Sequence, residues 1–391
     1  MPNILVMIPS GEVYDHDCVR WYNYKDVQGN LNHYHNIGDA FVFDSSLKLL
    51  NYDRLDVLKI REVRREDIDR YNAEYDYCFL RGSNYIHGSM EWENAIPVLE
   101  QLKIPVLAFG IGAQAPSTGK MQLSDTTKRV LRLIADHSVS LGVRGEFTAE
   151  VLWDLGIKNA RVVGCPTLYR NNNPELRVTL PDLDQVRDVV FTLRREVSGS
   201  YASDIERYLT LHHDSIVELS KRFNVIVSAQ GEIEEKKILW GTAEQREEAM
   251  TQLAHEKWFT GPDDPMIRLY RDKLFYSDVV TEYEQLMRAQ DLVLGYRLHG
   301  NLMALASGVP SVYFTYDSRT AEFVDTYRIP AFDVFSGKDF RLEDYWDQSL
   351  FERFNRAYHA RYRDMKLFLD ENGIDHKMGR ATEAGSLRSA A

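Results

Sequence analysis

An arginine and a histidine stand two residues apart, as Arg297 and His299, in a turn bounded by Gly295 and Gly300. The turn lies between a short apolar run, residues 291–294, and a helix-like segment. A guanidinium can hold a phosphate or carboxylate through two parallel hydrogen bonds, and an imidazole titrates near neutral pH. The turn therefore combines an anion clamp with a group suited to acid–base catalysis. A single histidine in an apolar region is also often a packed core residue, so both interpretations stay open.

A second arginine, Arg144, follows the apolar residues 139–143 and precedes a helix-like segment that starts near Thr148. At the carboxyl end of a strand, its side chain would face the ligand crevice of an α/β sheet. The alternative is a structural ion pair with Glu146 or Glu150. The chain has 47 Lys and Arg against 59 Asp and Glu, a net charge of −12. This balance argues against nucleic acid as a partner, so a bound anion must meet a local cluster of arginines.

Two glycine-containing turns stand where strands would lead into helices. Residues 36–39 read Asn-Ile-Gly-Asp, with Asn36 at the start and Asp39 as a natural N-cap. The other turn contains Gly110 and Gly112 and follows a very apolar run. Backbone N–H groups in such turns can bind an anion, but neither turn has the complete glycine fingerprint of dinucleotide-binding folds. Each turn is therefore either a ligand loop or a plain tight turn.

Short apolar runs alternate with amphipathic segments along the whole chain, which predicts a parallel α/β architecture. In the first half we expect strands at residues 3–8, 55–58, 77–80, 105–109, 139–143 and 161–163. The helices between them are expected at residues 40–50, 92–102, 126–135 and 148–155. In the second half we expect strands at residues 188–193, 224–228, 291–294 and 311–314, and helices at residues 204–222, 243–254, 283–288 and 302–306.

A length of 391 residues allows about two compact domains. We expect an N-terminal Rossmann-like lobe at residues 1–175, a C-terminal Rossmann-like lobe at 176–340, and a C-terminal extension at 341–391. In the extension, a helix at residues 342–369 would pack back across both lobes and a flexible tail would follow. Ligands of such folds bind outside the carboxyl ends of the strands, which predicts a site between the lobes.

The chain has three cysteines far apart in sequence, which indicates a reducing compartment and neither a disulfide framework nor a zinc site. No N-terminal targeting segment is visible, and the longest apolar runs fall far short of the roughly 20 residues that span a bilayer. We therefore expect a cytoplasmic protein, with peripheral contact at the inner face of the membrane as an open alternative.

Taken in order, these motifs resemble the polysaccharide pyruvyltransferase family over about residues 33–325. The resemblance is carried by residues 36–39, 110–112, 143–144, 155–156, 297–300, 307–311, 316–317 and 323. It implies two Rossmann-like lobes that resemble the glycosyltransferase-B arrangement. It also implies transfer of the pyruvyl group of phosphoenolpyruvate to two hydroxyls of a sugar, forming a pyruvate ketal and releasing phosphate. The acceptor would be a glycan or a lipid-linked oligosaccharide.

The resemblance also implies roles for individual residues. His299 would be the catalytic acid and base, with Asp39 as the next candidate. The donor would be bound by Arg144, Arg297, Gly110, Gly112 and Asn36. Phosphoenolpyruvate would be a substrate, and no cofactor or metal is expected; His33 and His35 could chelate as a pair, but a solvated loop is the simpler interpretation.

Aromatic residues gather before the first expected helix, among them Trp21 and Tyr34. Such rings can stack on the apolar face of a pyranose, although they could equally pack the unusually long segment 11–35. We expect the acceptor to bind there and around residues 313–319, where Tyr316 and Arg319 lie.

The sequence departs from the family pattern in three places. Gly145 and Glu146 follow Arg144 where many members continue with aspartate, Cys165 precedes Pro166 where Asp-Pro is common, and a glycine turn is replaced around Ser83. Two other functions therefore stay open: a nucleotide-sugar-dependent glycosyltransferase of the same architecture, and a non-catalytic glycan-binding relative.

Overall fold

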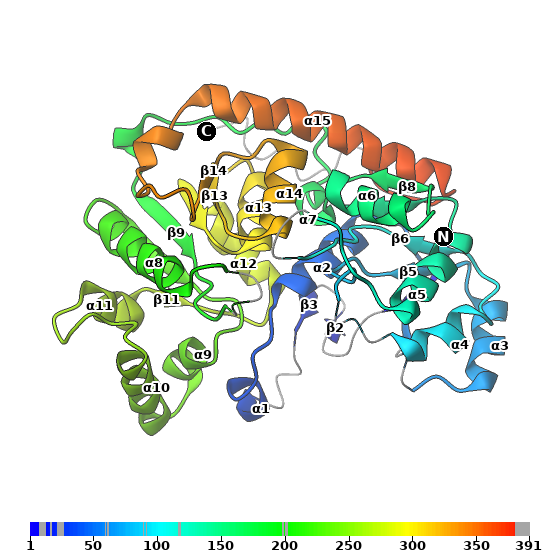
Figure 1. Cartoon of the computed structure of the whole chain (residues 1–391), viewed down its shortest axis with the longest axis horizontal. Coiled ribbons are helices and arrows are strands. Elements are labelled where there is room, and N and C mark those ends of the chain that lie inside the picture. Colours follow the sequence, from blue (N-terminus) through cyan, green and yellow to red (C-terminus); the bar gives the residue numbers. More distant parts are fainter. Residues whose placement is uncertain are drawn as a thin grey trace.

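The protein consists of two α/β lobes bridged by a long C-terminal helix, as shown by a computed structural model (Figure 1). The structure describes residues 1–7, 13–15, 18–21, 27–58, 60, 62–88, 90, 92–115, 119–197, 199 and 202–379. The expected strand position at residue 8 and most of the expected tail lie outside this part of the chain.

The N-terminal lobe is built on a parallel sheet in the order β4-β1-β5-β6. These strands are β1 (Asn3–Met7), β4 (Arg54–Leu58), β5 (Tyr77–Leu80) and β6 (Val106–Ala108). A bridge between Ile111 and Val143 connects this sheet to a parallel pair, β7 (Leu141–Val143) and β8 (Ala160–Val162). The helices of this lobe are α2 (Gly38–Leu49), α3 (Arg65–Glu74), α4 (Ile96–Leu99), α5 (Asp125–Asp136) and α6 (Glu146–Asp154).

The C-terminal lobe has a six-stranded parallel sheet in the order β11-β10-β9-β12-β13-β14. Its strands are β9 (Asp188–Thr192), β10 (Asn224–Ser228), β11 (Leu274–Phe275), β12 (Leu292–Gly295), β13 (Ser311–Thr315) and β14 (Ala331–Asp333). Its helices are α8 (Ile205–Ser220), α9 (Ile233–Trp240), α10 (Ala243–His255), α11 (Pro265–Asp272), α12 (Val280–Arg288), α13 (Leu298–Ala306) and α14 (Ser318–Tyr327). The order reverses between β9 and β12, and in doubly wound sheets ligands bind at the carboxyl ends beside such a reversal.

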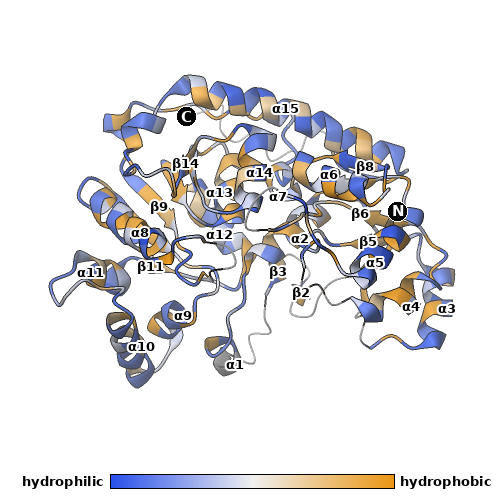
Figure 2. Ribbon diagram, viewed as in Figure 1, coloured by the Kyte–Doolittle hydropathy of each residue, from blue (hydrophilic) through white to orange (hydrophobic). Residues whose placement is uncertain are grey.

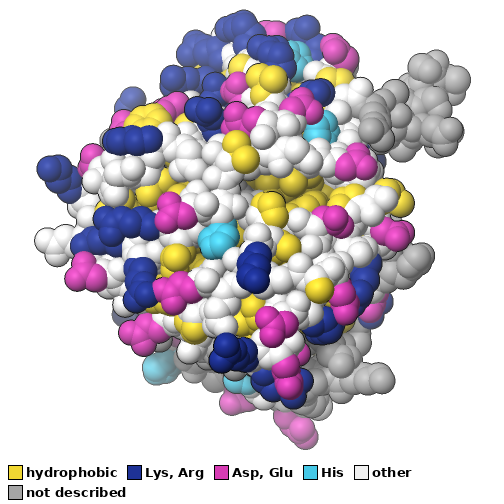
Figure 3. Space-filling view, turned by 90° about the vertical axis from the view of Figure 1, so that its right-hand side faces the viewer, with side chains coloured by type: hydrophobic (Ala, Val, Ile, Leu, Met, Phe, Trp, Pro, Cys, Tyr) yellow, Lys and Arg dark blue, Asp and Glu magenta, His cyan; other side chains and the backbone are white. Residues whose placement is uncertain are grey.

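The two lobes share a hydrophobic core instead of merely touching. One continuous cluster of buried side chains includes Val6 of β1, Phe41 of α2, Val190 of β9 and Leu302 of α13. The strands and the inward faces of the helices are apolar, and the polar residues lie outside (Figure 2). On the side of the molecule where the N-terminal lobe lies, basic and acidic side chains are interspersed (Figure 3). The lobes are therefore held together by the same burial that stabilises each of them.

The C-terminal helix α15 (Gln348–Glu371) runs along both lobes (Figure 1). It contacts the N-terminal lobe through Phe368, whose ring lies 6.1 Å from that of Phe109. The expected single helix at 342–369 is split, because Asp347 caps α15 by accepting a hydrogen bond from the Ser349 amide. Residues 342–345 form a separate short 3₁₀ turn before this cap.

The predicted fold class, two Rossmann-like lobes with a C-terminal helix packing back, is confirmed. The lobe boundaries at 175 and 340 stay predictions. Two short hairpin strands, β2 (Val13–Asp15) and β3 (Cys18–Arg20), and the helices α1 (Val27–Leu31) and α7 (Pro166–Tyr169) were not expected. Helix α14 was not expected either; it begins within residues 313–319, around which the acceptor is expected to bind.

Candidate active site

Arg297 lies where β12 ends and α13 begins, at the reversal of the C-terminal sheet. The preceding turn requires glycine: Gly295 has φ +122°, and a Cβ there would stand 2.7 Å from the Thr192 carbonyl oxygen. The guanidinium of Arg297 donates to the Leu193 carbonyl at 2.8 Å and to the hydroxyl of Tyr34 at 2.9 Å. It also forms an ion pair with Glu232, and both side chains are buried.

Glu232 was not anticipated from the sequence. It follows β10, and its carboxylate also accepts hydrogen bonds from the amides of Gln230 and Gly231. These bonds and the positive charge of Arg297 lower the pKa of Glu232 against the opposing effect of burial. Arg297 therefore already has a carboxylate partner, and donor binding by this residue stays a prediction.

Arg144 is placed differently. It follows β7, is only 1% exposed, and donates from Nε to the Gly110 carbonyl oxygen at 2.9 Å and from its terminal nitrogen to Asn84. The alternative of an ion pair with Glu146 or Glu150 is not realised: within the described ranges, no carboxylate lies within ion-pair distance of this guanidinium. Burial and the nearby charge of Arg319 lower its pKa.

The glycine turn at 110–112 makes the space that Arg144 occupies. A Cβ at Gly112 would stand 2.7 Å from the Arg144 Cδ atom, and Gly110 has φ +73°. The predicted glycines thus shape the pocket around the arginine. Whether their backbone also contacts the donor stays a prediction.

His299 lies in the first turn of α13 and is 5% exposed. Its Nε2 atom is buried and has no hydrogen-bond partner among the residues that the structure describes. Burial lowers the pKa of His299 well below its usual value, and the charges of four arginines lower it further; these are Arg144, Arg319, Arg81 and Arg297. The ring is therefore neutral at pH 7, at the centre of a positively charged cluster.

The N-terminus of α2 abuts this ring. A Cβ at Gly38 would stand 3.0 Å from both the His299 Nδ1 atom and the Asn36 side-chain oxygen, so a larger residue would have to displace one of these side chains. Asn36 also accepts a hydrogen bond from the Gly38 amide at 3.2 Å. The predicted motif at 36–39 is therefore brought next to the predicted histidine, although they are more than 250 residues apart in sequence.

Asp39 pairs with the guanidinium of Arg81 at 3.4 Å and accepts a hydrogen bond from the Ser83 hydroxyl at 3.2 Å. The segment around Ser83 is thus part of the site. Gly82 lies against the Phe109–Gly110 backbone, where a Cβ would approach within 2.3 Å. Arg81 and Asn84 were missed in the sequence, yet they follow β5 just as Arg144 follows β7.

The predicted acceptor residues lie in two places. Tyr34 is 37% exposed and its ring stands 5.8 Å from the Arg297 guanidinium carbon, at the rim of the cluster. Tyr316 and Arg319 are buried, and the Arg319 guanidinium donates to the Tyr316 hydroxyl at 3.0 Å. Trp21 is buried and packs against His35 at 6.1 Å between ring centroids.

The rings of His33 and His35 lie 5.8 Å apart, and burial lowers the pKa of His35 to about 3. Within the described ranges, no group of three or more His, Cys, Asp or Glu could hold a metal ion. The thiol of Cys165 is buried, which raises its pKa, and the Tyr327 hydroxyl accepts from its backbone amide at 2.7 Å.

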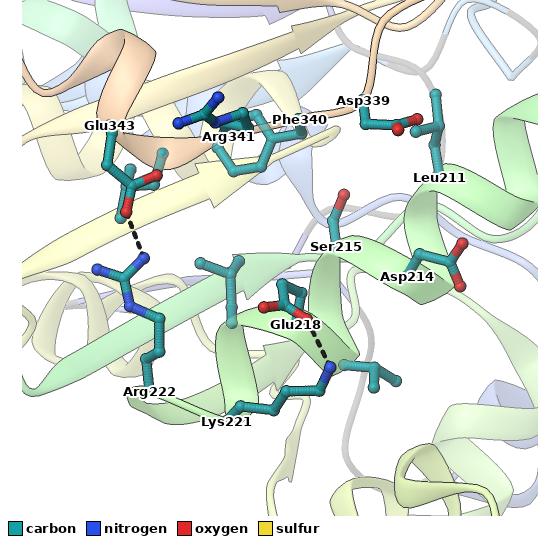
Figure 4. A pocket seen from close by; sticks show the side chains of 13 residues that line it. Leu211, Asp214, Ser215, Glu218, Lys221, Arg222, Asp339, Phe340, Arg341 and Glu343 are labelled. Carbon is teal, nitrogen blue, oxygen red and sulfur yellow. Dashed lines mark hydrogen bonds and ion pairs between the residues drawn. The ribbon is translucent and has the colours of Figure 1, made fainter.

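A large cavity of about 690 Å³ lies away from this cluster, between α8 and residues 339–343 (Figure 4). Four of its charged side chains form two ion pairs, Arg222–Glu343 at 2.5 Å and Lys221–Glu218 at 2.6 Å. It holds none of the predicted site residues, and we do not assign the active site to it.

The fold and the cluster define a two-lobed α/β protein with an arginine-rich cluster where the lobes meet. The family model of polysaccharide pyruvyl transferases matches residues 36–318, most of the chain. The chain belongs to this family, which is a family of transferases. The match includes Asn36, Arg144 and His299 and ends one residue before Arg319.

Solved structures of other proteins are similar over nearly the whole chain at low identity. UDP-GlcNAc 2-epimerase of Methanocaldococcus jannaschii is 14% identical, with a TM-score of 0.43 and 92% of each chain covered. Anabaena Alr3699/HepE, solved with UDP and glucose, is 12% identical, with a TM-score of 0.44 and 95% of each chain covered. None of the curated proteins matches significantly. In the described part of the chain, no helix is both long and apolar enough to cross a membrane.

Proposed function

We propose that the protein transfers the pyruvyl group of phosphoenolpyruvate onto two hydroxyls of a sugar, forming a pyruvate ketal and releasing phosphate. Family membership supports pyruvyl transfer to a polysaccharide or its precursor. The observation that carries the donor assignment is the cluster around His299: a neutral histidine, a buried Arg144 that lacks a carboxylate partner among the described residues, and further arginines nearby. Phosphoenolpyruvate brings both a phosphate and a carboxylate to such a cluster.

The proton balance of the reaction fits one histidine. Two sugar hydroxyls each lose a proton; one proton ends on the methylene carbon of the donor and the other on phosphate. His299 takes up a proton as the anionic donor enters, because the anion offsets the arginine charges that lower its pKa. It protonates the methylene carbon, which leaves an oxocarbenium-like centre.

The first hydroxyl attacks this centre and gives its proton to the now neutral His299. The C–O bond to phosphate then breaks, and phosphate leaves with that proton. The second hydroxyl closes the ketal and returns a proton to His299, ready for the next donor. The charges of Arg144 and Arg319 both act on this ring, and in the proposed steps these arginines hold the donor's negative charges throughout. Each hydroxyl attack forms one bond to the same carbon, so the product carries the pyruvyl carbon between two oxygens.

The acceptor would be a glycan or a lipid-linked oligosaccharide that the protein meets in the cytoplasm, free or at the membrane surface. Tyr34 offers a half-exposed ring at the rim of the cluster for such a sugar. Phosphoenolpyruvate is written as a substrate, and no cofactor enters these steps.

The test is an array of glycan acceptors incubated with phosphoenolpyruvate and scored for phosphate release and for a mass gain of one pyruvyl ketal. A nucleotide-sugar glycosyltransferase would release nucleoside diphosphate from its donor instead. A non-catalytic relative would bind a glycan and consume neither donor. Either of these results replaces the proposal.

A further inference from the structure

A chain of amide side chains connects the two lobes across the site. Arg144 donates to the side-chain oxygen of Asn84, and the Asn84 amide nitrogen donates to the side-chain oxygen of Gln114 at 2.8 Å. The Gln114 amide nitrogen then donates to a carboxylate oxygen of Asp317 at 3.3 Å. Arg144, Asn84 and Gln114 belong to the N-terminal lobe, and Asp317 belongs to the C-terminal lobe.

Every bond in this chain points the same way. Each group donates toward Asp317 and accepts from the side of Arg144, so the negative charge of Asp317 orients both amides. The same carboxylate oxygen lies 3.6 Å from the Arg319 guanidinium. One aspartate therefore acts directly on Arg319 and, through two amides, on Arg144, and both arginines lie beside His299.

The surroundings keep this chain in place. Gln114 and Asp317 are both buried, so water does not compete freely for their hydrogen bonds. Asp317 is also fixed as the N-cap of α14, where it accepts from the Thr320 amide at 2.8 Å. The other end is fixed because Arg144 donates from Nε to the Gly110 carbonyl.

We propose that Asn84 and Gln114 are positioning residues that form a relay between the lobes, so that Arg144 takes its donor-binding orientation only when Asp317 of the other lobe is in contact. This inference rests on the proposed function for the identity of the donor. It assigns a role to the segment around Ser83, where the sequence departs from its family, since that segment supplies Asn84. Arg144 and Arg319 then reach the donor as a pair set by one carboxylate.

Ser318, the residue after Asp317, provides a matched control because it also forms hydrogen bonds between the lobes. The Ser318 hydroxyl donates to the Ala115 carbonyl at 2.6 Å and accepts from the Ala115 amide at 3.0 Å. Ser318→Ala removes these bonds between the lobes without touching the relay. Gln114→Met keeps the length of the side chain but cannot hydrogen-bond.

The first experiment is a calorimetric titration of phosphoenolpyruvate into the parent protein, Q114M and S318A, with a melting curve for each. We expect Q114M to bind about fivefold to tenfold more weakly, the usual effect of one lost hydrogen bond, and S318A to bind within about twofold of the parent. Equal weakening in both variants would show that general docking of the lobes is responsible, which overturns the relay. Unchanged affinity in Q114M overturns it as well.

A charge exchange across the lobes is a second test. Gln114→Glu places a carboxylate against Asp317, so we expect affinity to fall by about tenfold or more. Adding Asp317→Asn supplies an amide that can donate to the introduced carboxylate and still caps α14, so affinity should recover in part relative to Gln114→Glu. Recovery stays incomplete because Arg319 loses its carboxylate partner. Failure of the double variant to recover, with a normal melting curve, contradicts the relay.

The relay can also be judged without the donor. A crystal structure of Q114M should show the Asn84 amide and the Arg144 guanidinium turned from their present positions, and S318A should show them in place. If the parent neither binds phosphoenolpyruvate nor releases phosphate from it, the proposed function fails. This structural comparison, with inorganic phosphate titrated as the anion, still decides the relay: an unmoved Arg144 in Q114M overturns it.

Discussion

Arg297 and Glu232 form a buried ion pair between the carboxyl ends of β12 and β10, whereas Arg144 on the opposite lobe has no such partner among the described residues. The two predicted donor arginines are therefore different in kind. The charge of Arg297 is balanced by a carboxylate inside the protein. The guanidinium of Arg144 donates only to a carbonyl oxygen and an amide oxygen among the described residues. An entering anion therefore gains more electrostatic stabilisation from Arg144 than from Arg297.

Arg144→Met should weaken binding of phosphoenolpyruvate by about tenfold to a hundredfold, because a charge-assisted hydrogen bond contributes about 1.5 to 3 kcal/mol. The melting temperature should stay at or above that of the parent, since the substitution removes a buried charge that lacks a carboxylate partner. Calorimetric titration and a melting curve on the same sample measure both. Affinity equal to that of the parent would remove Arg144 from the donor site.

Arg297→Met should instead destabilise the fold. It leaves the Glu232 carboxylate buried without its ion pair, which typically costs about 3 to 5 kcal/mol. Adding Glu232→Gln removes the stranded charge and should recover most of the lost free energy of unfolding. Urea unfolding of the parent, the single variant and the double variant provides the comparison. A single variant as stable as the parent would show that the pair has no structural role.

Strand ends explain how much of this site could be predicted from the sequence. Arg144, Arg297 and His299 each follow a short apolar run, and the carboxyl ends of parallel strands face a common crevice. Their position after an apolar run was sufficient to predict that these three residues face this crevice. It also applies to Arg81 and Asn84 after β5, but the segment was interpreted only as an eroded glycine turn.

Partners across the chain could not be predicted in the same way. Glu232 is 65 residues from Arg297, and Asp317 is 203 residues from Gln114. Such pairs depend on how the lobes dock, which no local periodicity encodes. The same holds for the region around Tyr316: no helix was expected there, but Asp317 and Thr320 form a capping box at the start of α14. Tyr316 and Arg319, which the sequence predicted as acceptor residues, are buried in the structure.

Acid should destabilise the protein through its buried histidines. The pKa of His299 and of His212 lies well below the usual value in the folded protein, and that of His35 is lowered to about 3. Below about pH 6.5 the unfolded chain binds protons at these positions and the folded chain does not, so stability falls as pH falls. Each histidine contributes at most about 1.4 kcal/mol per pH unit over this range.

His299→Asn should therefore reduce the loss of stability between pH 7 and pH 5 relative to the parent. Urea unfolding at each pH measures this, and Asn is chosen because it cannot take up a proton. A His137→Asn variant, at the C-cap of α5, is the control. Identical pH profiles for the parent and His299→Asn would mean that the folded and unfolded states protonate this ring alike.

The catalytic role of His299 predicts a separation of binding from turnover. His299→Asn should bind phosphoenolpyruvate with nearly parental affinity near pH 8, because the arginines that hold the anion remain. Its rate of phosphate release should fall by about a hundredfold to ten-thousandfold, the usual effect of losing a general acid or base. In the parent, titration in two buffers of different ionisation enthalpy should report proton uptake on donor binding, since the anion raises the pKa of the ring. The variant should report none. If it keeps more than about a tenth of the parental rate, the proton must come from elsewhere, and Asp39, held by Arg81 and Ser83, is the next residue to replace.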